Sequence, residues 1–373
     1  MKVLILDEDW SQTAYLVAGL REKGFDVVLA SPRTPDPRGL GRYGRQIPVP
    51  HAADPGYPRA LERILRDENA DLVLPTCEPI QFLLWGMPAE ATAHVFPVTT
   101  ARQRALLADR PALYRFVAAL DVPVPRMMPV GSDGDLKPAV AALGLPCVMR
   151  GTQGISGAQV RIVRSLDEAR GACAALRHVS PGVPFVQEYL DGGRCLIGGL
   201  FDHGRMLQWF SQSTIDAYPP VTGPSIRVRS LRDPVLTGHA ERIFAALEWN
   251  GLACAEFIRL GPGDYRFLEV NPRPWAAIRA AHRCGVPLQD SFIDYLRGDR
   301  SVRDSGFEDG VEVTLVPAFL SARLQAGQFP RWSDLGAYRQ SLAMLPWTKP
   351  PLLRYFIQSM LWARAAAMRG ARH

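Results

Sequence analysis

The chain has 373 residues and a formal net charge of +6, and hydrophobic and charged residues make up 47% and 21% of it. These values are typical of globular proteins, so disordered and fibrous classes are excluded, and the length predicts two or three domains. No run approaches the ~18–20 consecutive apolar residues of a membrane-spanning helix. The excess positive charge lies after Asp334, where no acid follows, whereas nucleic-acid-binding proteins spread basic charge over a face. No nucleic-acid partner is therefore expected.

The six cysteines are scattered, without a CxxC pair and without a histidine at zinc-ligand spacing. This usage predicts buried free thiols in a reducing compartment. The N-terminal apolar run, from Val3 to Leu6, is short and is followed by three acids, which is not the pattern of a signal peptide. We therefore expect a cytoplasmic protein.

The first hundred residues alternate between strand-like and helix-like segments. Strands are expected at 2–6, 25–30 and 70–75, and helices at 11–23 and 57–68. This alternation predicts a small parallel sheet with helical crossovers. The first turn reads Asp7-Glu8-Asp9 instead of a glycine-rich phosphate loop, so no dinucleotide site is expected there.

Beyond residue 100 the pattern changes to paired strands with isolated helices. One helix is expected over 101–120, and prolines at 123 and 125 mark a boundary after it. Further strands are expected at 146–150, 158–163, 184–189, 194–201, 206–212, 252–259 and 265–270, and further helices at 136–143, 166–177 and 239–247. This order predicts an α+β architecture and not a second doubly wound sheet.

The loop 151–157 contains three glycines and two hydroxyl residues between two expected strands. Glycine lets backbone N–H groups approach phosphate oxygens without a Cβ in the way, so the loop is a candidate phosphate site. An ordinary hairpin connection explains the same residues, and both interpretations stay open.

Two acidic residues are expected to meet on one sheet face near residue 270. Glu269 and Asn271 point the same way along one strand, and the turn 261–263 brings Glu256 opposite Glu269. Two carboxylates and an amide oxygen form the hard-oxygen site that Mg²⁺ prefers beside nucleotide phosphates, and Arg273 follows, where it can stabilise negative charge. Solvated carboxylates are the alternative, but the apolar segment around Glu256 favours the metal, because a buried unpaired acid is costly.

Several segments resemble the ATP-grasp ligases, especially the carbamoyl-phosphate-synthase-like and biotin-carboxylase-like branches. The resemblance covers residues 101–298, and its most specific block is Glu269-Val270-Asn271-Pro272-Arg273. The other matching segments are 146–157, 185–192, 251–257 and 285–287. The implied fold class is α/β plus α+β. It comprises a small parallel domain over 1–100, a two-lobed ATP-grasp domain over 101–300 that divides near Pro184, and a C-terminal helical extension over 301–373.

The resemblance also implies roles for residues along the expected cleft. In this family ATP phosphorylates a carboxylate and an amine displaces phosphate, so the expected cofactors are ATP and one or two Mg²⁺ ions, with Mn²⁺ as an alternative. Metal binding is implied for Glu256, Glu269 and Asn271, stabilisation of the phosphoryl group or acyl-phosphate for Arg273, phosphate binding for Ser156 and Gly157, and adenine binding for the backbone of Gln187, Glu188, Tyr189 and Leu190.

Three positions depart from the family pattern. Arg110 and Arg150 stand where the family has lysines that touch ATP phosphates, in a chain with 39 arginines and four lysines. Arg194 falls near the family's ribose-binding acid, and Asp191 is the nearest carboxylate. These departures keep two alternatives open, an ATP-binding module without ligase activity and a carboxylase-like or carbamoyl-transferring enzyme.

The acceptor side of the expected site is less defined. Arg227 and Arg229 alternate on an expected strand, where they meet phosphate or an acidic substrate, or lie on a solvated face; we include Arg227 among the catalytic candidates. Substrate-side candidates are Thr76, Glu78 and the expected loop 211–223. The substrates are expected to be a small carboxylate and an amine, and a homodimer is left open.

The C-terminal tail predicts an amphipathic helix that begins at Pro350-Pro351 and ends at Gly370. Its apolar stripe consists of Leu353, Phe356, Ile357, Met360, Leu361 and Met368. A helix docked on the protein's own body explains this pattern. A peripheral contact with the inner face of a membrane also explains it, because the tail is basic and contains no acid.

Overall fold

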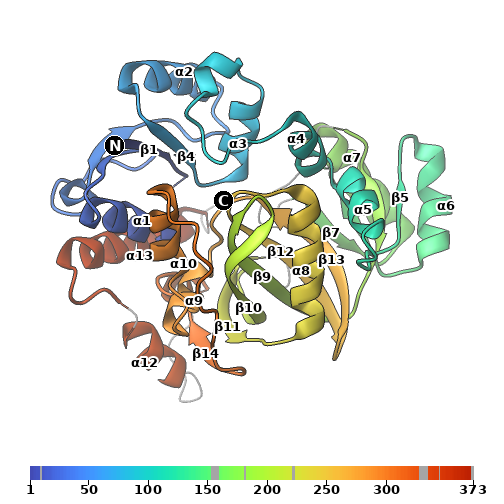
Figure 1. The fold of residues 1–373 in the computed structure, drawn as a ribbon. Helices are drawn as coiled ribbons and strands as arrows, with labels where there is room; N and C mark the ends of the chain where they lie inside the picture. Colours follow the sequence, from blue (N-terminus) through green and yellow to red (C-terminus); the bar gives the residue numbers. More distant parts are fainter. Residues whose placement is uncertain are drawn as a thin grey trace.

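The computed structural model describes residues 1–8, 11–152, 159–179, 182–220, 223–326, 335–343 and 345–370, which form three sheets with helices around them (Figure 1). Two loop residues of the resemblance, Ser156 and Gly157, lie outside the described residues. The mixture of one parallel and two largely antiparallel sheets confirms the predicted fold class.

The first sheet is parallel and has the strand order β3-β2-β1-β4. Its strands are β1 (Lys2–Leu6), β2 (Asp26–Ser31), β3 (Arg45–Pro48) and β4 (Leu72–Pro75), and its helices are α1 (Ser11–Glu22), α2 (Tyr57–Glu68) and α3 (Glu78–Trp85). The central strands are continuous apolar runs because helices cover both faces of such a sheet. The edge strand β3 is not a continuous apolar run, so it was not predicted from the sequence.

A second, small antiparallel sheet forms one wall of a cavity that lies between it and the large sheet. Its order is β5 (Met127–Pro129), β8 (Phe185–Glu188), β6 (Cys147–Arg150) and β7 (Val160–Val163), and its neighbouring helices are α4 (Ala101–Ala108), α5 (Arg110–Ala118), α6 (Asp133–Leu143) and α7 (Leu166–Val179). The single helix expected over 101–120 is in fact two, because Asp109 leaves helical geometry and its side chain accepts a hydrogen bond from the N–H of Ala112. Since β8 pairs with β6, the chain changes sheets between Glu188 and Gly193, after the Pro184 boundary expected from the sequence.

The large sheet has six strands and carries the other wall. Its order is β13 (Asp264–Asn271), β12 (Gly251–Gly261), β9 (Gly193–Asp202), β10 (Arg205–Ala217), β11 (Ser225–Ser230) and β14 (Glu312–Thr314). Helix α8 (Pro234–Leu247) packs on one face, and α9 (Ile278–Arg283) and α10 (Leu288–Leu296) pack on the other. Residues 211–217 belong to β10, so most of the expected substrate loop 211–223 is strand.

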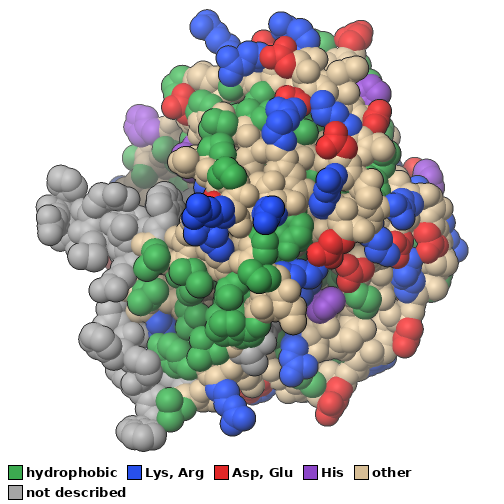
Figure 2. Space-filling view, turned by 90° about the vertical axis from the view of Figure 1, so that its left-hand side faces the viewer, with side chains coloured by type: hydrophobic (Ala, Val, Ile, Leu, Met, Phe, Trp, Pro, Cys, Tyr) green, Lys and Arg blue, Asp and Glu red, His purple; other side chains and the backbone are tan. Residues whose placement is uncertain are grey.

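The tail of the chain is docked on the body. Its helices are α11 (Ala318–Gln325), α12 (Leu335–Ala343) and α13 (Pro350–Gly370). Leu352, Tyr355 and Phe356 of α13 are buried in the core shared with α1. Two members of the expected stripe, Ile357 and Leu361, are exposed, while the side chain of Met368 lies outside the described residues. Figure 2 shows hydrophobic side chains gathered on the face that carries these C-terminal helices. In the described part of the chain, no helix has both the length and the apolar character needed to cross a membrane.

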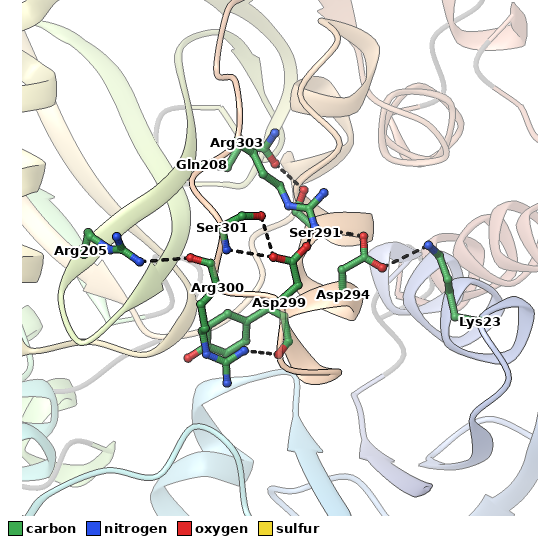
Figure 3. Close-up of polar contacts among 10 residues, drawn as sticks. Lys23, Arg205, Gln208, Ser291, Asp294, Asp299, Arg300, Ser301 and Arg303 are labelled. Carbon is green, nitrogen blue, oxygen red and sulfur yellow. Dashed lines mark hydrogen bonds and ion pairs between the residues drawn. The ribbon is translucent and has the colours of Figure 1, made fainter.

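A surface network of ion pairs joins the end of α1 to α10 and the segment after it, and a hydrogen bond joins that segment to β10 (Figure 3). Asp294 of α10 contacts Lys23 after α1 at 3.1 Å and Arg303 at 3.2 Å, and Arg303 also contacts Asp299 at 2.5 Å. Arg205 at the start of β10 donates to the carbonyl of Arg300. We call these six residues the surface network. It ties segments that are far apart in the sequence.

Candidate functional site

A cavity of about 480 Å³ lies between the small and large sheets. At one end it is lined by the apolar side chains of Val148, Ile162, Leu190 and Leu268. Its middle is lined by Glu256, Glu269, Asn271 and four arginines, Arg110, Arg150, Arg194 and Arg273. Most of the predicted site residues therefore meet in one place.

A β-bulge brings the two acids together on the cavity side of the large sheet. Tyr265 and Phe267 of β13 point into the core behind the sheet, and so does Val270. Strict alternation from Phe267 would send Glu269 into that core as well. The register instead shifts after the Phe257–Phe267 pair, so that Leu268 is the extra residue and Glu269 lies directly opposite Glu256. The predicted pairing of these acids is confirmed, whereas the bulge was not predicted.

Glu269 is held by Arg110 and Arg150, the two arginines at positions where the resemblance implies lysines. Its Oε2 accepts from Arg110 Nη2 at 2.8 Å and from Arg150 Nη2 at 3.1 Å. Burial pushes the pKa of Glu269 upward, but the two guanidinium groups outweigh burial and hold the pKa below its ordinary value. Arg150 also donates to Tyr114 and Gln187, which anchors it to the small sheet and α5. Glu269 is therefore ionised and joins the large sheet to α5 and the small sheet.

Glu256 is in a different environment, although it faces Glu269. Its Oε1 accepts from Asn271 Nδ2 at 3.1 Å. Burial, together with the charge of Glu269, raises the pKa of Glu256 to about 7. Two carboxylates directly opposite each other on neighbouring strands repel, and a divalent cation would remove that repulsion. No cluster of three or more His, Cys, Asp or Glu side chains with metal-ligand spacing occurs in the described ranges, so a metal there would rest on these two carboxylates and the Asn271 amide. That oxygen-rich donor set fits Mg²⁺.

Arg273 is tied to the first sheet's helix α3. Its Nε donates to Glu78 Oε2 at 2.6 Å, and both side chains are less than 10% exposed. Gln81, one turn further along α3, donates to the carbonyl of Pro272. Glu78 raises the pKa of Arg273, although burial alone would lower it. The loop that carries Arg273 is thus held by a helix nearly 200 residues earlier in the chain, a contact that was not predicted, because Glu78 was expected on the substrate side.

The remaining candidates divide between the cavity and the surface. Gln187, Tyr189 and Leu190 line the cavity. Glu188 instead pairs with Arg126 at 2.7 Å, and Asp191 is exposed and is not among the lining residues.

Arg194 lines the cavity, where it donates to the carbonyl of Gly223 at 2.8 Å. Arg227 is not among the lining residues: it pairs with Asp216 at 2.8 Å and with Glu312 at 3.0 Å on the outer strands of the sheet. Thr76 donates to the buried carboxylate of Asp7, behind the first sheet. The structure therefore keeps Arg227 and Thr76 apart from the paired acids.

Among the other lining residues, Gln212 and Trp275 were not singled out as site residues, although Gln212 belongs to the substrate-side segment 211–223. Gln212 and Trp275 are almost fully buried and line the cavity beyond Glu256. Trp275 is adjacent to the metal-like block, but Gln212 lay inside the expected loop and had no motif to mark it.

Sequence comparison relates the chain to part of a larger protein. No family model matches it. It is 26% identical over 261 residues to the carbamoyl phosphate synthase large chain of Thermomicrobium roseum, which covers 64% of this chain and 24% of that protein. It is 24% identical over 216 residues to the large chain of Thermoanaerobacter pseudethanolicus, covering 54% and 20%. The chain thus spans about a quarter or less of the length of these curated relatives.

Several solved structures share the fold. The biotin carboxylase of Campylobacter jejuni in complex with β-γ-ATP has a TM-score of 0.68 at 14% identity, covering 83% of this chain and 74% of that chain. An N5-carboxyaminoimidazole ribonucleotide synthetase in complex with ADP has a TM-score of 0.63 at 15% identity, covering 83% and 78%. The L-amino acid ligase of Bacillus licheniformis has a TM-score of 0.60 at 15% identity, covering 78% and 73%. The chain therefore shares its fold with these three solved structures and is similar in sequence to part of the synthase large chains, as the resemblance to the ATP-grasp ligases implies.

Proposed function

We propose that the chain is an ATP- and Mg²⁺-dependent ligase that joins a carboxylate to an amine through an acyl-phosphate. One observation carries this proposal: Glu256 and Glu269 face each other in a cavity between two sheets, flanked by four arginines. Carboxylates bind the cation and arginines neutralise phosphate charge, which is what phosphoryl transfer requires of a protein.

The cavity residues then have distinct roles. Val148, Leu190 and Leu268 would contact the base, while Glu256, Glu269 and Asn271 would hold Mg²⁺. Bound Mg²⁺ would neutralise charge on the triphosphate during transfer. Arg273 would stabilise the transferred phosphoryl group, with its guanidinium oriented by Glu78.

The direct test measures ADP release by the full chain with ATP, Mg²⁺ and a panel of carboxylic acids and amines. We expect release that depends on both substrates, and a Glu269→Gln variant should lose at least about a hundredfold in rate because it removes a metal ligand. Glu68→Gln is the matched control, since Glu68 also contacts two basic residues, Lys2 and Arg45, but lies outside the cavity. Full activity in the Glu269→Gln variant would refute the assignment.

A second candidate is a nucleotide-binding module without catalysis. The specific observation in its favour is that Arg110 and Arg150 both pair with Glu269, the acid that would hold the metal. Calorimetry with ATP and Mg²⁺ tests this candidate: tight binding without ADP release for any acid, bicarbonate included, would favour the module. Release with bicarbonate alone would instead indicate a carboxylase-like or carbamoyl-transferring reaction. If the double variant Arg110→Lys/Arg150→Lys releases ADP where the unmodified chain does not, the two arginines suppress catalysis.

We also propose a cytoplasmic protein, with either a homodimer or a peripheral membrane contact as further options. The exposed Trp347, Ile357 and Leu361 and the basic tail support a surface contact. Against a membrane, Lys349 and Arg354 are already paired with Glu22 and Asp36. Co-sedimentation of the full chain with anionic vesicles at low salt separates these options. If the protein stays in the supernatant, it makes no membrane contact. A mass in solution of twice that of one chain would then show a homodimer.

A further inference from the structure

The end of the cavity beyond Glu256 has no role in nucleotide binding as proposed above. Strand register places its residues on one face of the large sheet: Leu196 of β9 pairs with Glu256 on one side and with Gln212 on the other. Neighbouring strands lie about 4.8 Å apart, so Gln212 is about 10 Å from Glu256 along this row. Such a distance leaves room for a small second substrate next to the metal and the reacting phosphoryl group.

Trp275 covers the same region from above the sheet. Its indole rests on Gly198, where an added Cβ would lie only 2.5 Å from Cη2 of the ring. Gly198 is two residues from Leu196 along β9 and therefore faces the same side. Trp275 also follows Arg273 by two residues, so the loop that presents the arginine presents the indole as well.

Both residues have a buried polar atom without a hydrogen-bond partner among the residues that the structure describes. The atoms are Oε1 of Gln212, an acceptor, and Nε1 of Trp275, a donor. The two side chains are 1% and 2% exposed, yet both line the cavity. An unmet buried donor or acceptor is costly, so a ligand that provides both kinds of partner would bind there favourably.

The charge of the lining restricts the class of ligand. Four arginines and two glutamates line the cavity, so the basic side chains are in excess. The lining therefore favours a ligand with an anionic group. Gln212 Oε1 in turn requires an N–H or O–H donor.

We propose that Gln212 and Trp275 form the acceptor subsite of the ligase proposed above, and that it takes a free amino acid. The amino group donates to Gln212 Oε1, and a carboxylate oxygen accepts from Trp275 Nε1–H. Gln212 is an amide and not a base, so it positions the amine without taking its proton. This proposal rests on the proposed function for its chemistry, but the binding itself does not require turnover.

Calorimetry on the full chain tests the subsite without relying on turnover. The protein is first saturated with Mg²⁺ and an ATP analogue that carries an imido bridge between the β- and γ-phosphates. The twenty common L-amino acids are then titrated singly, together with propionate as alanine without its amino group. We expect at least one amino acid to bind, and its affinity to fall at least about tenfold in Gln212→Leu and Trp275→Phe. Gln212→Glu, which keeps an acceptor, should retain binding.

Matched controls separate a lost contact from a damaged fold. Ser213→Ala changes the next residue, on the other face of β10, and Trp209→Phe makes the same change in an indole that does not line the cavity. Both controls should bind the amino acid as the unmodified chain does, and all variants should bind the ATP analogue equally. Failure of every amino acid to bind, or unchanged affinity in Gln212→Leu, would overturn the subsite.

A ligase assay makes the two proposals distinguishable. If ADP release requires an amine but the KM for that amine is unchanged in Gln212→Leu, the subsite fails and the ligase stands. If amino acids bind as expected but no ADP is released with any acid, the ligase fails and the subsite stands as a binding site.

Discussion

Two ion-pair clusters of this chain use the same chemical groups in different surroundings. In the cavity, Glu269 contacts Arg110 and Arg150, whose side chains are 10% and 7% exposed. In the surface network, Asp294 contacts Lys23 and Arg303, whose side chains are 44% and 29% exposed (Figure 3). Exposed pairs contribute only ~0–1 kcal/mol because water screens them, whereas breaking a buried pair costs ~3–5 kcal/mol.

The difference shows which charges the fold depends on. The surface network joins α1 to α10, but its partners are solvated whether or not they are paired. The cavity cluster joins the small sheet and α5 to the large sheet. Its two arginines have much less access to water than Lys23 and Arg303, although Glu269, at 23%, is about as exposed as Asp294, at 26%. A bound cation or phosphate group would therefore change the electrostatic interactions among the charged side chains of the cavity and leave those of the surface network unchanged. The four predictions below test this contrast in order of expected effect.

The largest effect is expected when Glu269 is removed. Glu269→Ala leaves Arg110 and Arg150 adjacent and without their shared carboxylate, and burial together with the charge of Arg150 already lowers the pKa of Arg110. We expect the free energy of unfolding to fall by ~3–5 kcal/mol, measured by urea denaturation without ligands. A loss below ~1 kcal/mol would mean that the cavity cluster behaves like a surface pair.

The second prediction concerns the contact between α3 and the Arg273 loop. Glu78→Gln keeps the side chain's shape but removes its charge beside Arg273, so we expect the free energy of unfolding to fall by ~2–3 kcal/mol. The same denaturation measurement checks this value. Asp167→Asn is the control, because the Asp167–Arg170 pair is exposed and should change little. Equal losses of unfolding free energy in the two variants would show that burial does not make the Arg273–Glu78 pair stronger than an exposed pair.

The third prediction follows from the raised pKa of Glu256. Between pH 4.5 and about 7 the folded protein keeps a proton on Glu256 that the unfolded chain releases, so this residue makes stability fall as pH rises through that window. Between pH 5 and pH 8, we expect the free energy of unfolding to fall by up to ~3 kcal/mol less in Glu256→Gln than in the unmodified chain. Urea denaturation of both proteins at the two pH values, without Mg²⁺, measures this difference. Since Mg²⁺ must displace that proton, its affinity should weaken below pH 7. Identical pH profiles in the two proteins would show that Glu256 ionises normally.

The smallest effect is expected in the surface network. Asp294→Ala removes the contacts to Lys23 and Arg303, and we expect the free energy of unfolding to fall by less than ~1 kcal/mol at low salt and by less still at high salt. Thermal denaturation of Asp294→Ala and the unmodified chain at two salt concentrations measures this loss. A loss comparable to that of Glu269→Ala would remove the distinction between the two clusters.

Local pattern accounts for the parts of the fold that the sequence predicts well. The strands β1, β2 and β4 are apolar runs, and Gly24 and the Asp-rich turn delimit them, so each element is specified by its own residues. The β12–β13 hairpin that carries Glu256 and Glu269 is similarly local, because a short turn joins its strands, whereas the bulge at Leu268 that sets the two acids directly opposite each other was not predicted. The split at Asp109 was missed because the apolar pattern continues across it, although a capping residue and Arg110-Pro111 were present as signals.

The sequence by itself therefore determined most of the strands and helices, the hairpin that carries the two carboxylates and the arginines available to neutralise charge. Only the tertiary structure decided that Arg273 pairs with Glu78, that Arg227 is held by Asp216 and Glu312, and that Gln212 and Trp275 line the same cavity. The physical reason is the range of the interactions. Strand alternation and hairpin register depend on residues a few positions apart, whereas these ion pairs and cavity walls form only when distant segments pack against each other and exclude water.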